Sequence, residues 1–309
     1  MDYVSVRVST LRGDQQIGFD AYVKINEKMI LYLRRGDEFS GPRLLKLKQK
    51  KLKKMYIATS DESSYLDYLQ KNIEVAYDKN STKDINTRAE IIHGAQQSNA
   101  EEVFDNPGDV AAYNLAKDAA GKYVDFLFSN DQALSSILKI ENADASISHH
   151  GVSVSTIAVA LCEKLKIDDP KKIQLVSLGA LLHDFGHNES HLNISRPLAE
   201  FSKEDLEIYK KHAKVGAAKI QDKKHFDQTV INIIAQHEEK IDGSGFLGLK
   251  EKQLDPLSII VSLANVADRM ISFDKTLQTD VAKKMMIERV GQYPLGHIQQ
   301  LAELFKKTN

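Results

Sequence analysis

Five successive helical segments in the second half of this sequence each carry a histidine or an aspartate where their apolar stripe predicts a hydrophobic residue. Burying an imidazole or a carboxylate without a hydrogen-bond or charge partner costs on the order of 1–3 kcal/mol or more of folding free energy. Five such helices therefore indicate that these side chains share a binding partner. Eight of the ten histidines also lie between residues 149 and 237. The pattern predicts a helical core built around bound metal. The stripe residues are His150, His183 with the adjacent Asp184, His212, His237 and Asp268.

The helical spacing of the neighbouring apolar residues supports each assignment. His150, for example, is in phase with Val154, Ile157 and Leu161. His149 is rotated by about 100° from that stripe, so we expect it to be exposed or to make a contact at the start of the helix. One histidine on an apolar face is more often a hydrogen-bonded core residue than a ligand. Five such helices in one chain favour ligands.

The number of candidate ligands bears on the kind of metal site. Four histidines and two aspartates exceed the four ligands of a tetrahedral zinc ion. They suit two borderline metals, iron or manganese, joined by a carboxylate, and Asp184 is the expected bridge. Two metals roughly 3.5–4 Å apart stabilise in-line attack on a phosphate ester. The residues alone therefore predict phosphoester hydrolysis.

Composition limits the other classes of function. With 309 residues, 42% of them apolar, and a net charge of −1, the chain is typical of a soluble protein of about two domains. Near-neutral charge argues against a dedicated nucleic-acid-binding protein. No apolar run approaches the roughly 20 residues of a membrane span. The only cysteine, Cys162, lies in an apolar helical stretch and fits a reducing, cytoplasmic location as a core thiol.

The first 75 residues follow a strand period instead. Apolar residues alternate with polar ones over 4–8 and 19–25, and a turn at 26–28 predicts a hairpin with 29–33. A helix over 43–54, a strand over 55–59 and a helix after Asp61 complete the expected pattern. We therefore predict a mainly α protein with a small N-terminal α+β domain. The expected divisions are a regulatory or interaction domain (1–75), a linker and helical connection (76–124), and an all-α bundle (125–309).

A lysine-rich stretch in the N-terminal region has two interpretations. Six of the nine residues from 46 to 54 are lysines. The simpler interpretation is the solvated face of a helix, and the alternative is docking to an acidic protein surface or to nucleic acid. The N-terminal domain is thus a candidate for binding a protein partner. Whether the helical region between 85 and 130 forms a homodimer stays open.

The order of the motifs resembles the HD superfamily of metal-dependent phosphohydrolases, and more narrowly its HD-GYP branch. The resemblance covers roughly residues 125–300 and implies an all-helical bundle that hydrolyses cyclic di-GMP in bacterial signalling. It also implies metal-ligand roles for the six stripe residues, with Glu238 as a further candidate. The matching motifs are His183-Asp184-x-Gly186, His212-x-x-x-Gly216, His237-x-Glu239-x-x-Asp242-Gly243-Ser244-Gly245 and Val266-Ala267-Asp268.

The sequence departs from the family pattern around the substrate positions. Gly245-Phe246-Leu247 replaces the Gly-Tyr-Pro that the family links to docking of diguanylate cyclase domains, and His187 replaces a lysine. Ser146 stands where three-metal members often have glutamate, so we expect two metals. No arginine-rich segment is recognisable after the last aspartate. Arg196-Pro197 matches the basic residue and proline that follow the His-Asp motif in the family, and we expect Arg196 to contact phosphate.

Two classes of function follow. The leading hypothesis is a dinuclear iron or manganese phosphodiesterase that opens cyclic di-GMP to the linear dinucleotide or GMP. Its expected catalytic residues are Asp184, His187 and Asp242, the latter two as proton donors, and its expected substrate-binding residues are Arg196, Gly216 and Ser244. The alternative is a catalytically weak or inactive metal-binding protein that acts as a cyclic-dinucleotide receptor or scaffold. Hydrolysis of another phosphoester suits the ligands but not the Asp-Gly-Ser-Gly loop.

Overall fold

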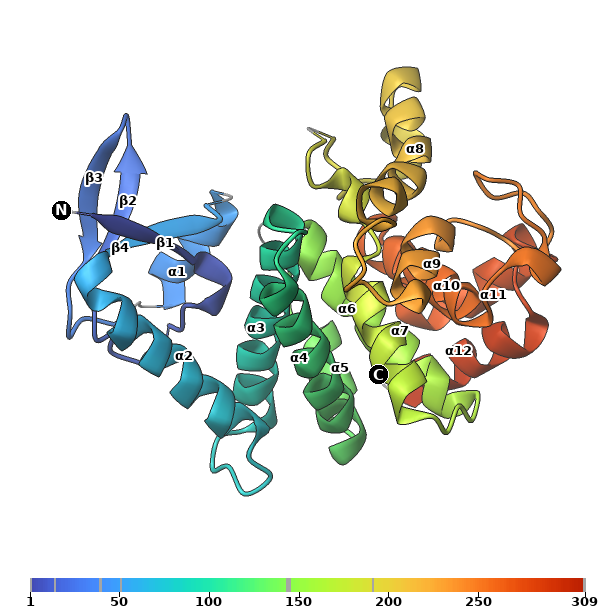
Figure 1. Ribbon diagram of the computed structural model, residues 1–309. Coiled ribbons are helices and arrows are strands. Elements are labelled where there is room, and N and C mark those ends of the chain that lie inside the picture. The colour runs from blue at the N-terminus through green and yellow to red at the C-terminus, as the bar shows by residue number, and fades with distance from the viewer. Residues whose placement is uncertain are drawn as a thin grey trace. The chain divides into compact units, whose positions relative to one another are not determined.

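The computed structural model describes residues 2–13, 15–38, 41–50, 52–142, 146–190 and 192–307. Its contacts divide the chain into two compact units, one of residues 1–98 with 140–145 and one of residues 99–139 with 146–309. Twelve α-helices and one four-stranded sheet are present in the described residues (Figure 1). The predicted fold class, mainly helical with a small N-terminal α+β region, is confirmed.

The N-terminal unit is built on an antiparallel sheet with the strand order β1-β4-β2-β3. Its predicted hairpin is confirmed, because β2 pairs with β3 around a turn in which Asn26 and Glu27 have φ of 47° and 63°. Positive φ at both central residues suits the right-handed twist of the paired strands. The strands are β1 (Tyr3–Arg7), β2 (Ala21–Ile25), β3 (Lys28–Leu33) and β4 (Lys54–Ala58).

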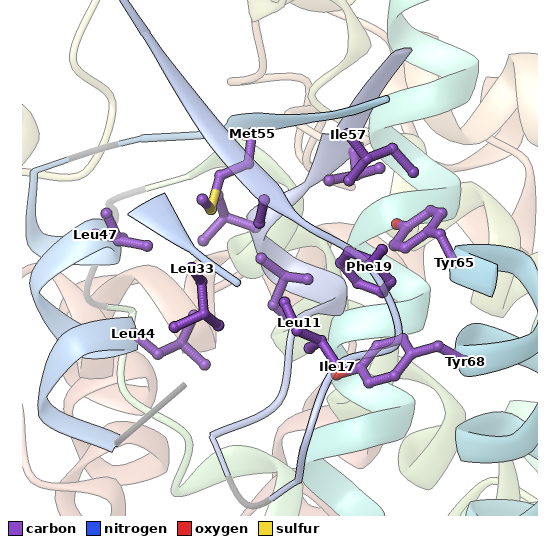
Figure 2. Packing of buried hydrophobic residues seen from close by; sticks show 13 residues of the cluster. Leu11, Ile17, Phe19, Leu33, Leu44, Leu47, Met55, Ile57, Tyr65 and Tyr68 are labelled. Atoms are coloured by element: carbon purple, nitrogen blue, oxygen red, sulfur yellow. The ribbon is translucent and has the colours of Figure 1, made fainter. Parts of the chain in front are cut away.

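Alternating residues of the sheet form one apolar core with two helices, α1 (Gly41–Gln49) and α2 (Glu62–Tyr77). Figure 2 shows this cluster, in which Phe19 meets the rings of Tyr65 and Tyr68 edge-on at 5.5 and 5.7 Å. α1 ends at Gln49, earlier than the helix over 43–54 that the sequence predicted, because Lys54 already pairs with Arg7 in the sheet. The long helix α3 (Ile85–Asp105) follows α2.

The second unit is a bundle of helices in which α7 is central. α7 packs against α4, α6, α9 and α10, and α8 packs against α9. Because α7 is enclosed on these sides, the residues at its C-terminal end lie in the interior. The helices are α4 (Val110–Ser129), α5 (Ala133–Leu138), α6 (Ile147–Lys164), α7 (Pro170–Leu182), α8 (Lys203–Ile220), α9 (Gln228–Gln236), α10 (Pro256–Ser272), α11 (Gln278–Glu288) and α12 (Leu295–Lys307).

Local capping chemistry fixes three helix starts of this bundle. Asp169 and Asp255 each cap a helix whose first residue is proline, with their carboxylates accepting backbone N–H groups. At α8, Ser202 and Asp205 form a reciprocal capping box. In the part of the chain that the structure describes, no helix has both the length and the apolar character needed to cross a membrane.

Candidate metal centre

Asp184 stands at the centre of the candidate site. α7 ends at Leu182, and a 3₁₀ turn, η3 (Phe185–His187), begins directly after Asp184. The Asp184 carboxylate is buried, and its Oδ1 lies 3.2 and 3.7 Å from the Nε2 atoms of His212 and His237. Its Oδ2 lies 3.4 and 3.9 Å from the Nε2 atoms of His183 and His150. One carboxylate oxygen therefore faces each pair of histidines.

Backbone hydrogen bonds orient three of these imidazoles in the same way. His183 Nδ1 lies 2.7 Å from the Ala180 carbonyl, His237 Nδ1 lies 3.0 Å from the Ile234 carbonyl, and His212 Nδ1 contacts the Tyr209 carbonyl. A carbonyl oxygen only accepts, so each Nδ1 carries the proton. In neutral imidazole Nε2 then presents a lone pair, which is the arrangement that metal-binding histidines use.

The resulting lone pairs fit cations. His212 Nε2 and His237 Nε2 are 2.7 Å apart although both Nδ1 atoms hold their protons. Two lone pairs this close repel each other unless a proton or a metal lies with them. Buried His183 Nε2 makes no hydrogen bond, and an unpaired buried nitrogen is costly. Both features suit a bound metal at these histidines and Asp184.

Three groups of candidate ligand atoms, each with its atoms within 4.8 Å of one another, occur among the described residues. They are His150 with His183 and Asp184, Asp184 with His187 and His212, and His212 with His237 and Glu238. Asp184 and His212 each belong to two groups, so the three form one continuous cluster. It contains five of the six expected stripe ligands, the further candidate Glu238, and His187, which we expected as a catalytic residue.

Asp268 contacts this cluster through His150. Its Oδ2 lies 2.6 Å from His150 Nδ1, and its Oδ1 accepts a hydrogen bond from Ser272. The other nitrogen of His150 lies 3.0 Å from Asn265 Oδ1. None of the three groups in the described chain includes Asp268. The structure thus shows this carboxylate orienting His150, and its predicted role as a ligand stays a prediction.

A second polar network surrounds Glu238. The Tyr209 hydroxyl donates to Glu238 Oε1 at 2.5 Å, and Asn265 Nδ2 donates to the same atom at 3.1 Å. The guanidinium of Arg269 lies 5.1 Å from the centre of the Tyr209 ring and donates to the carbonyls of Ile194 and Arg196. α8 and α10 supply the donors of this network, which holds the Glu238 carboxylate, just beyond the end of α9, beside His212 and His237.

The sequence prediction missed Tyr209, Asn265 and Arg269. Asn265 precedes Asp268 by three residues on one face of α10, and Arg269 directly follows Asp268, so both had a signal in their spacing. Arg269 is a single buried arginine, whereas the family pattern is a run of several arginines. Tyr209 had no such signal, because an aromatic residue on a helix stripe is an ordinary core residue.

Charge and burial set the protonation of the buried groups. Burial alone would raise the pKa of Asp184, but the neighbouring histidines, His183 first, hold it well below the usual range. Burial and then His183 lower the pKa of His237 well below its ordinary value. For His212, burial lowers the pKa, but the hydrogen bond and charge of Asp184 outweigh it and raise the pKa overall. Asp184 is therefore an anion at neutral pH.

His187 is buried in the same cluster. Its ring stacks on that of His212, with centroids 4.0 Å apart and planes 18° apart. Burial, followed by the nearby His212, lowers the pKa of His187 to about 3. The side chain is therefore a neutral imidazole at pH 7.

Two glycines allow the 3₁₀ turn and α8 to touch. A Cβ on Gly186 would overlap the His212 carbonyl oxygen, and one on Gly216 would lie 2.8 Å from the Gly186 nitrogen. The backbones therefore meet without side chains between them, which brings His212 to Asp184. The structure gives Gly216 this packing role, and its expected contact with substrate stays a prediction.

The loop after α9 is organised by Glu239. This buried carboxylate accepts hydrogen bonds from the backbone N–H groups of Leu247 and Leu249, at 2.7 and 2.9 Å. Asp242 and Ser244 are exposed on the loop, where Asp242 accepts the Ser244 N–H at 2.8 Å. These two expected site residues therefore contact each other. Among the described residues, Asp242 belongs to none of the three groups of candidate ligand atoms. Phe246 meets the Tyr209 ring edge-on at 5.9 Å.

Arg196 is attached to the start of α8. Its Nη2 lies 2.6 Å from Asp205 Oδ2, and its guanidinium lies 4.7 Å from the centre of the Phe201 ring. These contacts fix the segment between the 3₁₀ turn and α8. The contact with phosphate that we expected for Arg196 stays a prediction. His149 is buried in the first turn of α6, which agrees with a contact at the start of the helix and not with exposure.

Comparison with known proteins places this geometry in context. A family model of the HD domain matches residues 147–270. The solved structure of Bd1817, an HDG"Y"P protein from Bdellovibrio bacteriovorus, is 63% identical, covers 99% of this chain and 100% of that chain, and superposes with a TM-score of 0.94. The cyclic di-GMP phosphodiesterase PA4108 of Pseudomonas aeruginosa is 25% identical over 188 residues, which make up 55% of this chain and 45% of that protein. The chain thus matches less than half the length of this curated relative.

Proposed function

This chain belongs to the HD-GYP family of HD-domain proteins, and on that premise we propose that it is a metal-dependent phosphodiesterase that holds two metal ions. The substrate that we propose is cyclic di-GMP, opened to the linear dinucleotide or to GMP. The relative from Pseudomonas aeruginosa, named a cyclic di-GMP phosphodiesterase, supports this substrate. The same relative does not favour the alternative of an inactive receptor or scaffold.

The observation that carries the proposal is the division of Asp184 between two pairs of histidines. Oδ1 faces the Nε2 atoms of His212 and His237, and Oδ2 faces those of His183 and His150. One carboxylate with a separate nitrogen pair at each oxygen suits two cations better than one. The mixture of imidazole nitrogen and carboxylate oxygen suits iron or manganese.

When bound, such a metal pair would supply Lewis-acid stabilisation of the charge on a phosphodiester and of its attacking water. The residues of the chain do the rest. Asp184 provides the anionic charge that offsets the cations, and the backbone carbonyls hold each Nε2 toward it. Tyr209 and Asn265 hold Glu238 beside the His212 pair. Because these groups are fixed before substrate arrives, little reorganisation is needed during the reaction.

The protonation states of the two candidate proton donors, His187 and Asp242, bear on their expected role as the acid. The lowered pKa of His187 leaves it neutral, so it has no imidazolium proton to give at pH 7. Hydrogen bonds from Ser244 lower the pKa of Asp242, so this exposed carboxylate is ionised as well. Neither residue is favoured as the acid.

Turnover by the intact chain tests the proposed activity. Protein loaded anaerobically with iron or manganese is mixed with cyclic di-GMP, and the products are separated by chromatography. We expect linear dinucleotide or GMP from the wild type and none from His183→Ala, with His149→Ala as the matched loss of a buried histidine outside the ligand groups. Wild-type protein that holds two metals and leaves the substrate intact would contradict the proposed activity.

Metal content tests the bridging role of Asp184 separately. Asp184→Ala removes an oxygen from both sides of the site, so we expect the purified protein to lose both metals and to unfold at a lower temperature. The control is Asp222→Ala, which removes an exposed carboxylate. Elemental analysis and thermal unfolding provide the measurements. Unchanged metal content in Asp184→Ala would contradict the bridge.

A further inference from the structure

His187 has an unused nitrogen inside the candidate metal centre. Its Nε2 is buried and makes no hydrogen bond. This residue also departs from the family pattern, which has a lysine at this position. A lysine carries a positive charge and repels a cation, whereas a neutral imidazole can bind one. The substitution therefore changes what the position can do chemically.

The neighbouring serine determines which nitrogen of His187 holds the proton. The Ser190 hydroxyl donates its one hydrogen to the His187 carbonyl oxygen at 3.0 Å. Its oxygen also faces His187 Nδ1 at 3.4 Å, where it can act only as an acceptor. Nδ1 is therefore the donor of this long hydrogen bond, and Nε2 carries the lone pair. His187 has the same tautomer as the three histidines that the backbone carbonyls orient.

The local fold brings the His187 imidazole close to Asp184 and His212. Side chains three residues apart are eclipsed in a 3₁₀ turn, and the His187 N–H bonds to the Asp184 carbonyl at 2.8 Å. Because Gly186 has no side chain, α8 approaches the turn closely enough for His212 to stack on His187. As a result, the ligand atoms of Asp184, His187 and His212 lie within 4.8 Å of one another.

We propose that His187 Nε2 is a metal ligand that shares a cation with Asp184 and His212. This inference rests on the metal site of the proposed function and adds an imidazole to its His212 side. His187 thus puts a neutral imidazole where the family pattern has a positively charged lysine. When bound to a metal, this imidazole would take a ligand position that would otherwise be open to water or substrate. An additional imidazole favours iron, zinc and similar metals over magnesium and calcium.

Two substitutions separate ligation from packing. His187→Phe keeps a ring that can stack on His212 but has no ligand atom. His187→Ala removes both and leaves space that free imidazole can enter. His149→Ala is the matched control, since it removes a buried histidine that lies outside the three groups. Circular dichroism establishes that each variant is folded.

The measurement is anaerobic titration of metal-free protein with Mn²⁺ and Fe²⁺, followed by calorimetry and by elemental analysis after gel filtration. We expect His187→Phe and His187→Ala to bind one of the two metals at least about 10-fold more weakly than the wild type. Free imidazole should restore affinity to His187→Ala and leave His187→Phe unchanged. The His149→Ala control should bind both metals as the wild type does.

The outcomes distinguish this inference from the proposed function. Wild-type affinity for both metals in folded His187→Phe would overturn the ligand assignment and leave the dinuclear phosphodiesterase standing. A wild type that binds two metals but does not cleave cyclic di-GMP, with weakened binding in His187→Phe, would support the assignment while contradicting the activity. A wild type that binds no metal would overturn both.

Discussion

The thiol of Cys162 lies near the end of α6, on a helix that is buried along most of its length. Burial raises the pKa of Cys162 to about 12. Reactivity requires the thiolate, and a thiol with this pKa is almost entirely protonated at pH 8. The residue therefore acts as a small apolar side chain of the core.

We expect native protein to remain unlabelled by a thiol reagent such as DTNB at pH 8. Unfolding in guanidinium chloride should expose one reactive thiol per chain, because the sequence contains one cysteine. Absorbance of the released chromophore measures both states. Rapid labelling of the folded protein would show that α6 opens far more readily than its burial implies.

The histidines of the cluster could be picked out from the sequence as candidate ligands because each one interrupts a periodic apolar stripe. Glu238 and Asp268 are different cases. The carboxylate of Glu238 is positioned by donors from α8 and α10, and Asp268 faces His150 of another helix. Such orientations depend on how helices meet, which residue spacing within one helix does not determine. The roles of all these residues as ligands stay predictions.

At the scale of secondary-structure elements, the contact of η3 with α8 holds the two halves of the cluster together. Asp184 belongs to the segment before η3, and His212 belongs to α8. The distance of 3.2 Å between Asp184 Oδ1 and His212 Nε2 depends on the backbone contact that Gly186 and Gly216 permit. A side chain at Gly186 has no flexible neighbour to displace, since the atoms that a Cβ there would meet are main-chain atoms of His212 and Gly216.

Gly186→Ala should therefore move α8 away from the 3₁₀ turn. We expect the free energy of unfolding to fall by about 1–3 kcal/mol, the usual cost of overpacking, and metal affinity to fall with it. Urea unfolding and metal titration provide the measurements. Gly296→Ala is the control, because nothing lies within 4 Å of a Cβ built there. Equal effects of the two substitutions would show that the close contact is not maintained in solution.

Helices and strands were predicted well where local sequence signals were strong. They were predicted poorly where long-range strand pairing determines the end of an element. The hairpin was predicted from its turn and its alternating residues, and it is present. The starts of α7, α8 and α10 likewise depend on local capping residues. The end of α1 was misplaced because pairing of β4 with β1 prevails over helix propensity. The length of α3 was hard to judge because its buried face includes polar residues such as His93, Gln96 and Gln97.

At the scale of the whole molecule, metal binding is coupled to the folding of the second unit. All the candidate ligands lie in that unit, on segments that are far apart in the sequence. The unfolded chain does not hold these atoms together, so metal binds the folded state preferentially. Such a ligand stabilises a protein by about 2.7 kcal/mol at a concentration of 100 times its Kd.

We expect Mn²⁺ to raise the unfolding temperature at pH 8, and a chelator to lower it. The gain should shrink as the pH falls toward 6. In the metal-free folded protein, burial lowers the pKa values of His150 and His212, but bonds to Asp268 and Asp184 respectively outweigh it and raise them. Protons therefore compete with metal as the pH falls through these raised values. Calorimetry with and without Mn²⁺ measures the difference, and an equal gain at both pH values would contradict the competition.

The carbonyls that orient His183, His212 and His237 belong to the main chain. No side-chain substitution deletes a carbonyl, so mutation around these histidines leaves their orientation intact while the helices persist. The orientation of His187 relies on the Ser190 hydroxyl and can be lost in a single mutation. We therefore expect the orientation of these three imidazoles to survive substitutions of neighbouring side chains that the orientation of His187 would not survive at Ser190.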